Sequence, residues 1–325
     1  MLYRTIGGRR TVSGLCLGTM NFGTSTDPDT AATILDRFVE AGGTFIDTSN
    51  NYGQWGKEAG LSEEVIGQWL RSRGTRDQVV IATKCGARTT KPGDPGDAHW
   101  EGLSAAVVET AAKESLGRLG IDRIDLFYAH IDNRATPLEE TVGAFGRLAA
   151  EGVVDVIGCS NTTSWRVEQA RRLAQDQGVE QYSVLQQRYT YLWPSPLPLT
   201  GVDRLGTPHF SHAGIEHFDY LSEHRDMTLV AYSPLLAGAY SRPERPLPAV
   251  SGYAHPSASM RFEVLRQVAQ ELGATTNQVV LAWMLHQDPV VIPLFGASSV
   301  AQLDEALGAL EIDLDTDLLE RLNNA

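Results

Sequence analysis

The chain has 325 residues, 42% of them hydrophobic and 21% charged, and a formal net charge of −13 at pH 7. This composition is typical of a globular protein with a sizeable core, and its acidic excess argues against nucleic acid or an anionic membrane as the main partner. Three widely spaced cysteines disfavour a disulfide framework, and we find neither a signal-peptide pattern nor an apolar run long enough to cross a bilayer. We therefore expect a cytoplasmic protein.

Strand-like and helix-like patterns alternate along the chain after a hairpin signal at Gly7 and Gly8. The expected strand–helix units, in chain order, are 15–18 with 30–43, 44–47 with 62–74, 79–84 with 104–120, 124–130 with 136–152, 153–161 with 164–178, 182–187 with 215–225, 228–233 with 261–272 and 276–286, and 290–296 with 300–310. Asp29 and Ser62 are expected to cap the first two helices. A long Pro-rich loop follows the sixth strand.

Eight such units predict a closed barrel. The strands are short, rich in Val, Ile and Leu and almost continuously apolar, as parallel strands buried on both faces are. They indicate an α/β fold, a (β/α)8 TIM barrel with an N-terminal β-hairpin and a long loop after strand 6, in a single domain over 1–325. The alternative, a doubly wound open sheet, usually has Gly-x-Gly-x-x-Gly after its first strand, whereas the turn here reads GTMNFG.

Four polar side chains follow three neighbouring strands, at the barrel end where active sites lie. Asp47 and Tyr52 come after the second strand, Lys84 after the third and His130 after the fourth. A phenol, with a free pKa of about 10, becomes a usable proton donor when an ammonium stabilises its phenolate, and a carboxylate supplies the counter-charge of that ammonium. A neutral histidine can hydrogen-bond a carbonyl oxygen. The set suits carbonyl reduction.

Each of these residues also has a structural interpretation of its own. Asp47 is of the type that forms turns, and Tyr52 would serve as a packed aromatic. Lys84 would serve as a solvated strand end, and His130 as a core histidine. Their joint placement on adjacent strand ends favours chemistry over these separate interpretations.

The sequence resembles the aldo-keto reductase superfamily over nearly its whole length. The matching segments, in order, are GLCLGTMNFG, FIDTSNNYG, VVIATK, DLFYAHID, EGVVDVIGCSN, LQQRY, LVAYSPLLAG and VIPLFGASSVAQLDEALGAL. The resemblance implies a (β/α)8 barrel with an amino-terminal hairpin and a catalytic tetrad of Asp47, Tyr52, Lys84 and His130. In that tetrad Tyr52 would be the general acid, Lys84 and Asp47 would tune it, and His130 would orient the carbonyl.

The resemblance also implies a nicotinamide dinucleotide cofactor bound without a Rossmann domain. Ser160, Asn161 and Gln186 would hold the carboxamide, Tyr232 would stack on the nicotinamide ring, 233–238 would follow the pyrophosphate and 296–300 would face the adenosine phosphate. The full expected set is Gly18, Thr19, Met20, Asp47, Ser160, Asn161, Gln186, Tyr232, Ser233, Pro234, Leu235, Gly238, Gly296, Ser298, Ser299, Gln302 and Glu305. Structural interpretations remain for such residues: strand-end amides often satisfy loop backbone, and Tyr232 would also suit a core.

The adenosine end of the expected cofactor site departs from the family pattern. Many relatives place an Arg or Lys where this chain has Ser298 and Ser299, and Glu-Asn where it has Glu305-Ala306. A 2′-phosphate favours cationic partners. The family makes NADPH the expected cofactor, these departures leave NADH open, and Arg242 is a candidate helper.

The expected substrate residues are Met20, Trp55, Trp100, Tyr189 and Trp193. They predict an aromatic-rimmed pocket for a small aldehyde or ketone, such as a sugar, cyclic or polyketide-like ketone. The alternative is that the Pro-rich loop over 189–214 uses its aromatic residues to pin itself down.

Two other functions remain open from the sequence. Some relatives are accessory subunits of potassium channels and keep the tetrad, so a nicotinamide-binding accessory subunit is the alternative to an enzyme. A metal-dependent barrel hydrolase would use His130 and Asp132 and would need further ligands, of which only Asp47 is present at the strand ends; we expect no metal. The sequence does not indicate an oligomeric state.

Overall fold

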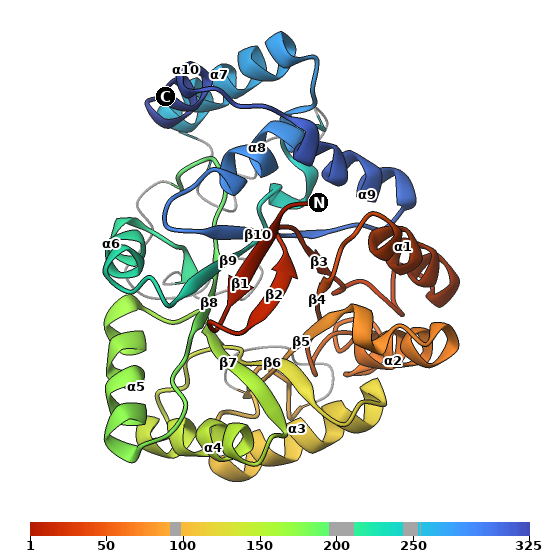
Figure 1. The fold of residues 1–325 in the computed structure, drawn as a ribbon, viewed down its shortest axis with the longest axis vertical. Coiled ribbons are helices and arrows are strands. Elements are labelled where there is room, and N and C mark those ends of the chain that lie inside the picture. The colour runs from red at the N-terminus through yellow and green to blue at the C-terminus, as the bar shows by residue number, and fades with distance from the viewer. Residues whose placement is uncertain (92–98, 195–210, 243–252, 254) are drawn as a thin grey trace.

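The computed structural model describes residues 1–91, 99–194, 211–242, 253 and 255–325. Eight parallel strands form a closed barrel in the order β10-β3-β4-β5-β6-β7-β8-β9, and β1 and β2 form a separate antiparallel pair. Helices surround the barrel on its outside, and α7 and α10 lie together beyond α8 (Figure 1). The predicted (β/α)8 barrel with its amino-terminal hairpin is confirmed.

The elements follow the predicted order. The strands are β1 Tyr3–Ile6, β2 Arg10–Ser13, β3 Cys16–Gly18, β4 Phe45–Asp47, β5 Val80–Cys85, β6 Ile124–Ala129, β7 Val154–Ser160, β8 Val184–Arg188, β9 Thr228–Tyr232 and β10 Val291–Gly296. The helices are α1 Pro28–Glu40, α2 Leu61–Arg73, α3 Ala105–Leu119, α4 Leu138–Ala150, α5 Ser164–Gln177, α6 Ile215–Glu223, α7 Pro256–Leu272, α8 Thr276–Leu285, α9 Val300–Leu307 and α10 Thr316–Asn323, with short turns η1 Arg76–Gln78, η4 Leu236–Gly238 and η6 Gly308–Glu311.

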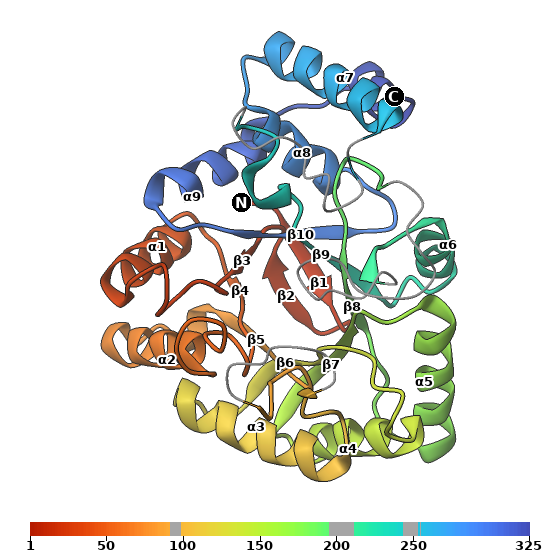
Figure 2. The same cartoon turned by 180° about the vertical axis from the view of Figure 1, so that it is seen from behind.

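The hairpin closes one end of the barrel. Ile6 and Val12 are fully buried and belong to the cluster of side chains that fills the barrel interior. The turn at Gly7 has a φ of 56°, and a Cβ there would lie 2.9 Å from Val156 Cγ1, so the turn rests directly on β7. The hairpin lies across the barrel in Figure 1, and Figure 2 shows the molecule from behind. Ligands therefore have access from the other end, where the strands finish.

Two predicted helix caps are wrong. Asp27, not Asp29, caps α1, because its carboxylate accepts hydrogen bonds from the backbone N–H groups of Asp29 and Thr30 at 3.1 and 3.0 Å. Helix α2 begins after Gly60, and Ser62 lies within it with its hydroxyl buried. That hydroxyl donates to the carbonyl of Thr19 at 2.9 Å, which ties α2 to the loop after β3.

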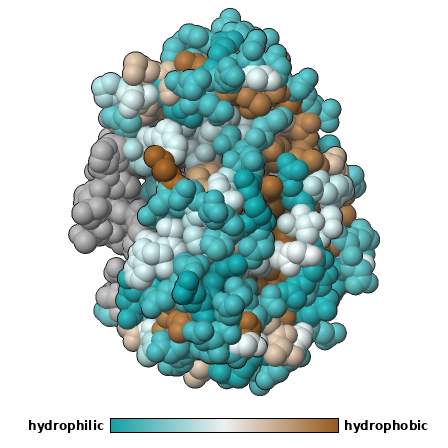
Figure 3. Space-filling view, turned by 60° about the vertical axis from the view of Figure 1, so that its left-hand side comes forward, coloured by the Kyte–Doolittle hydropathy of each residue, from teal (hydrophilic) through white to brown (hydrophobic). Residues whose placement is uncertain are grey.

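The cysteines, the helices and the surface add three observations about the fold. Cys16, Cys85 and Cys159 are free thiols and are buried, as packing residues are. In the described ranges, no helix is both long and apolar enough to pass through a membrane. The face in Figure 3 is mostly hydrophilic, with hydrophobic residues in narrow strips between polar ones.

Candidate active site

A tight loop after β4 carries Tyr52 to the mouth of the barrel. Pairing with β5 continues past the end of β4, since the Asn50 N–H donates to the carbonyl of Lys84 at 3.1 Å. The chain then turns at Gly53, which has a φ of 109° and where a Cβ would lie 2.2 Å from the carbonyl oxygen of Glu58. Only glycine fits this turn. The loop thereby places Tyr52 above the end of β5.

The Lys84 ammonium sits at the centre of the site. It forms an ion pair with Asp47, donates to the carbonyl of Thr48 at 2.7 Å and donates to Tyr52 Oη at 3.2 Å. Gln186 Nε2 donates to the second oxygen of Asp47 at 2.8 Å. The side chains of Lys84 and Asp47 are 0% exposed. All three N–H groups of the ammonium thus have acceptors, as a buried charge requires.

Burial and charge act in opposite directions on these groups. Burial lowers the pKa of Lys84, but Asp47, Tyr52 and their hydrogen bonds outweigh it and hold that pKa above its usual value. Burial raises the pKa of Asp47, and Lys84 and Gln186 offset this only in part. Burial also raises the pKa of Tyr52, while the Lys84 ammonium lowers it. At neutral pH the phenol is therefore protonated and lies beside a cation that stabilises its phenolate.

His130 faces the same space from the end of β6. Its backbone N–H donates to the carbonyl of Cys85 at 2.8 Å, and its Nδ1 lies 3.1 Å from Ser49 Oγ. Its ring meets that of Tyr52 edge-on, with centroids 6.2 Å apart and planes at 78°. Burial, and after it the Lys84 ammonium, lower the pKa of His130 well below its usual value. The imidazole is therefore neutral at pH 7.

The expected carboxamide-binding residues also gather next to His130. Asn161 Nδ2 donates to the carbonyl of His130 at 2.9 Å and to Ser160 Oγ at 3.0 Å. The Tyr232 hydroxyl donates to Asn161 Oδ1 at 2.7 Å, and the Asn161 N–H donates to the carbonyl of Gln186 at 3.2 Å. Asn161 has a φ of 52°, which is uncommon for a residue other than glycine. Amide and hydroxyl groups on three strands thus surround the site.

Gly296 leaves space at the edge of the mouth. Gly18 and Gly296 pair across β3 and β10, and Gly18 also pairs with Asp47. Among the described residues, a Cβ on Gly296 would come within 4 Å only of the carbonyl oxygen of Gly18, at 3.9 Å. The Thr19 hydroxyl donates to the carbonyl of Asp47 at 2.9 Å, which holds the first loop down. The open space over Gly296 and the nearby amides fit an extended, polar cofactor.

The loop after β9 contains a run of strained backbone. Ser233, Leu236 and Ala237 have φ values of 55°, 47° and 54°, a conformation that costs roughly 1 to 3 kcal/mol for each such residue. Strain of this kind collects at ligand-binding loops. The expected cofactor residues of this loop are Ser233, Pro234, Leu235 and Gly238.

The start of α9 has its own internal hydrogen bonds. Ser299 caps the helix, with its Oγ accepting from the Gln302 N–H at 3.3 Å. Gln302 Oε1 accepts from the Ser298 N–H at 2.8 Å and from its hydroxyl at 3.0 Å. Glu305 Oε1 accepts from Asn277 Nδ2 at 3.2 Å. The exposed Ser298 is therefore the part of this segment that a ligand phosphate would meet first.

The expected substrate residues divide into exposed and buried ones. Met20, Trp55 and Trp193 have exposed fractions of 51%, 55% and 42%, which is high for large hydrophobic side chains. Trp100 is partly buried and forms a β-bridge with Thr89 in the loop after β5. Their loops follow β3, β4, β5 and β8, so all four residues lie on the mouth side of the barrel.

The expected substrate residue Tyr189 is buried against aromatic side chains of the helix layer. It is 6% exposed, stacks on Trp283 with ring centroids 5.6 Å apart and packs against Phe218 at 4.9 Å. It follows the last residue of β8, where side chains alternate between the interior and the helix layer, and it falls on the helix side. Most of the expected pocket loop, 195–210, lies outside the described residues.

Three contact residues of the site were not expected from the sequence. The Thr48 carbonyl binds Lys84, the Ser49 hydroxyl meets the His130 ring, and Asn50 is bonded to a loop carboxylate. Thr48, Ser49 and Asn50 lie between Asp47 and Tyr52 in the chain, so their position between two expected site residues was the signal that could have identified them. The loop carboxylate, Glu101, had no comparable signal.

Asp132, a candidate ligand in the metal-hydrolase alternative, forms ion pairs with two arginines. Asp132 forms ion pairs with Arg134 and with Arg166, the latter at 3.0 Å. Within the described ranges there is no group of three His, Cys, Asp or Glu side chains that could hold a metal ion. Two guanidinium partners satisfy Asp132 without a metal.

These groups lie together at the mouth of a closed parallel barrel: a buried lysine–carboxylate pair, a protonated phenol and a neutral imidazole. The arrangement is that of an oxidoreductase that acts on carbonyl and alcohol groups. The Aldo/keto reductase family model matches residues 14–325, and the chain belongs to this family. It is an NAD(P)H-dependent oxidoreductase.

Similar proteins come from bacteria and fungi. The chain is 34% identical over 323 residues to the uncharacterised oxidoreductase YrpG of Bacillus subtilis, covering 96% of this chain and 92% of the relative. It is 30% identical over 318 residues to norsolorinic acid reductase stcV of Emericella nidulans, covering 94% and 76%. It is 27% identical over 339 residues to an aryl-alcohol dehydrogenase [NADP(+)] of Phanerodontia chrysosporium, covering 96% and 82%.

Proposed function

We propose that the protein reduces an aldehyde or ketone to an alcohol, with Tyr52 as the proton donor. The observation that carries this proposal is the Lys84 ammonium, which contacts both Asp47 and Tyr52 Oη, the latter at 3.2 Å. Such a cation stabilises the phenolate that forms when Tyr52 gives its proton to the carbonyl oxygen. Asp47 holds the ammonium in place and balances its charge.

His130 would orient the substrate oxygen. If the Ser49 hydroxyl donates to Nδ1, which lies 3.1 Å away, the ring proton is on Nε2. A neutral Nε2–H can donate to a carbonyl oxygen without competing with Tyr52 for its proton. The nicotinamide cofactor, when bound, supplies the hydride. Ser160, Asn161 and Gln186 would hold its carboxamide, and Tyr232 would lie against its ring.

We propose NADPH as the cofactor. One relative is named aryl-alcohol dehydrogenase [NADP(+)], which supports this choice. The Ser298 N–H and hydroxyl, which here donate to Gln302 Oε1, would exchange that partner for a 2′-phosphate. Arg242 lies beside Gly238 in the loop after β9. The sequence 290–311 contains no Lys or Arg, so NADH remains the competing cofactor.

The substrate is proposed to be an aromatic or polycyclic carbonyl compound. Exposed Met20, Trp55 and Trp193 on the mouth side would pack against a flat apolar body. One relative is named for norsolorinic acid and another for aryl alcohols, and an aryl alcohol is the product of reducing an aromatic carbonyl compound. We further propose that residues 1–325 act as one domain in the cytoplasm.

Two measurements test the proposal. Titration with NADPH and with NADH, followed by tryptophan fluorescence, should show binding, and tighter binding of NADPH. The Tyr52→Phe variant should bind the cofactor as the wild type does and lose turnover by a factor of about 10³ or more, because a general acid contributes on that order. Binding of neither nucleotide, or turnover that survives in the Tyr52→Phe variant, would refute the assignment.

A further inference from the structure

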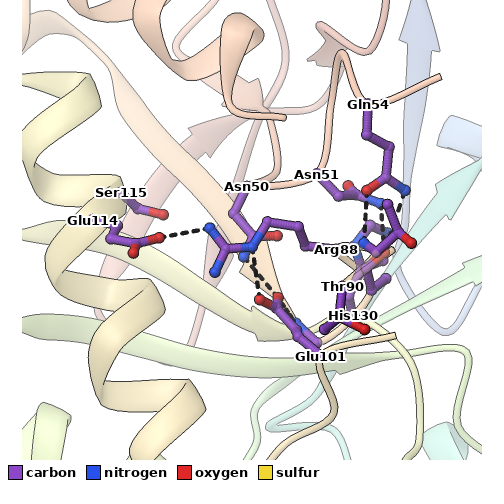
Figure 4. Close-up of polar contacts among 12 residues, drawn as sticks. Asn50, Asn51, Gln54, Arg88, Thr90, Glu101, Glu114, Ser115 and His130 are labelled. Atoms are coloured by element: carbon purple, nitrogen blue, oxygen red, sulfur yellow. Dashed lines mark hydrogen bonds and ion pairs between the residues drawn. The ribbon is translucent and has the colours of Figure 1, made fainter. Parts of the chain in front are cut away.

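A buried carboxylate in the loop after β5 contacts two segments that carry proposed catalytic residues. The Glu101 side chain is 5% exposed, and its Oε1 accepts hydrogen bonds from Asn50 Nδ2 and from the Gly86 N–H, each at 2.8 Å. Its Oε2 accepts from Arg88 Nε at 2.9 Å. Asn50, Gly86, Arg88 and Glu101 form what we call the Glu101 cluster, which is seen in Figure 4.

The two donors to Glu101 Oε1 lie next to the proposed acid and its cation. Asn50 is two residues before Tyr52, and Gly86 is two residues after Lys84. Gly86 has a φ of 110°, and a Cβ there would lie 2.7 Å from Leu103. This turn, which favours glycine, lets the N–H of residue 86 reach Oε1. A single oxygen atom therefore joins the loop of Tyr52 to the strand end of Lys84.

The same two loops are also joined by residues before and after Tyr52, namely Asn51 and Gln54. Asn51 Nδ2 and Gln54 Nε2 donate to the carbonyl of Ala87 at 3.2 and 3.4 Å, and the Thr89 N–H donates to Gln54 Oε1 at 2.9 Å. Figure 4 shows these contacts beside those of Glu101. Tyr52 is thus held between two attachment points, of which Glu101 supplies the shorter bonds.

The Tyr52–Lys84 contact is sensitive to small movements of either loop. Its N···O distance of 3.2 Å is at the long end of the range for such bonds, about 2.7 to 3.2 Å. A shift of a few tenths of an ångström would break it. A misplacement of about 1 Å in an active site can cost about 100-fold in rate, so a smaller shift is still measurable.

Neutralising Arg88 does not explain this arrangement. Arg88 Nη1 already binds Glu114 Oε2 at 2.7 Å, and Glu114, at 39% side-chain exposure, also approaches Arg118 at 3.6 Å. A carboxylate needed only for the charge of Arg88 could leave its other oxygen in water, whereas Oε1 of the nearly buried Glu101 has its hydrogen bonds from Asn50 and Gly86.

We propose that Glu101 is a positioning residue of the active site, whose Oε1 fixes the distance between the Tyr52 hydroxyl and the Lys84 ammonium. This inference rests on the proposed role of Tyr52 as proton donor. If Glu101 has this role, removing its carboxylate should lower kcat by displacing Tyr52 from Lys84, and should leave the Kd for the cofactor unchanged.

The test uses three variants of the full chain, with benzaldehyde and phenanthrenequinone as probe substrates and NADPH as cofactor. Glu101→Ala removes the shared acceptor, and kcat should fall about tenfold with the Kd for NADPH unchanged. Glu101→Gln keeps an oxygen for Asn50 and Gly86, and should stay within about threefold of wild type. Glu114→Ala is the matched control, because it removes the other partner of Arg88, and should behave as wild type.

The pH profile provides a readout that a general loss of stability would not move. The groups that act on the Tyr52 hydroxyl are Lys84, Asp47 and Tyr232, with the neutral His130 ring beside them. Loosening the Lys84 contact weakens the influence that lowers the pKa of Tyr52. The alkaline limb of kcat should therefore move to higher pH in Glu101→Ala and stay in place in Glu101→Gln.

Three results would overturn the inference: wild-type kcat in Glu101→Ala, an equal loss in Glu101→Gln, or an equal loss in Glu114→Ala. Should Glu101→Ala fail to fold, Asn50→Ala, which leaves no unpaired charge, must show the same loss of kcat and the same shift of the alkaline limb. The Tyr52→Phe variant separates the two proposals. If it keeps its turnover, the proton-donor role fails; if it loses turnover while the Glu101 variants match wild type, only the positioning role fails.

Discussion

Replacing Lys84 with methionine should remove most of the electrostatic support for the Tyr52 phenolate. The ammonium lies 3.2 Å from Tyr52 Oη in a fully buried position. At an effective dielectric constant of about 20, two unit charges at that distance attract by about 5 kcal/mol. If about half of the phenolate charge has developed in the transition state, kcat falls by roughly 50- to 100-fold.

The same change should destabilise the fold, because it leaves the Asp47 carboxylate buried and unpaired. Breaking a buried ion pair in this way costs about 3 to 5 kcal/mol. The double variant Lys84→Met with Asp47→Asn has no buried charge, so it should recover most of the stability and none of the lost turnover. Urea unfolding and steady-state rates on the same preparations separate the two effects.

The pH profile gives the second part of the test. The Lys84 ammonium lowers the pKa of Tyr52, so its removal should move the alkaline limb of kcat to higher pH. A Lys84→Met variant that keeps kcat within threefold of wild type, or whose alkaline limb stays in place, would show that the ammonium does not act on the phenol during the reaction.

Three further outcomes are expected. Gly53→Ala should lose roughly 1 to 3 kcal/mol of stability and most turnover, since its Cβ would lie 2.2 Å from a backbone oxygen. Gly56→Ala, whose Cβ would meet no described atom within 4 Å, should keep wild-type stability and turnover. His130 is neutral in the folded protein because burial lowers its pKa. The free energy of unfolding should therefore be at its maximum above about pH 6.5 and fall below that pH, where the unfolded chain takes up a proton at this residue. The His130→Gln variant should show a smaller fall in urea titrations at different pH values. Ser298→Arg should favour NADPH over NADH by about tenfold in Kd, and an unchanged ratio would place the 2′-phosphate elsewhere.

The order of elements could be predicted because each barrel strand is apolar on both faces. Strands such as Val80–Cys85 and Ile124–Ala129 are buried at every position, so their composition marks them without any partner. Helix starts were harder to predict, since several residues near a start can act as a cap. Asp27 and Asp29 are equivalent by type, and only the β-region backbone of Asp27 decides between them.

The four expected catalytic side chains could be placed together because each lies at or shortly after the end of a strand. The barrel then brings consecutive strand ends to one rim. Glu101 could not be found in this way, because it is 51 positions from Asn50 in the chain and meets it through a loop. The packing of Tyr189 on Trp283 could not be predicted either, because the two residues are far apart in the chain and Tyr189 lies just beyond the end of β8 at Arg188.

The hairpin over the base of the barrel has a kinetic consequence. Because Ile6 and Val12 fill that end, the cofactor and the substrate of a reductase of this shape enter through the same opening. Whichever ligand sits deeper must arrive first and depart last. If the nicotinamide lies against Tyr232 and Asn161, as proposed, the oxidised cofactor leaves only after the alcohol product has left. The shape of the barrel, rather than the relative affinities, then sets the order of binding and release.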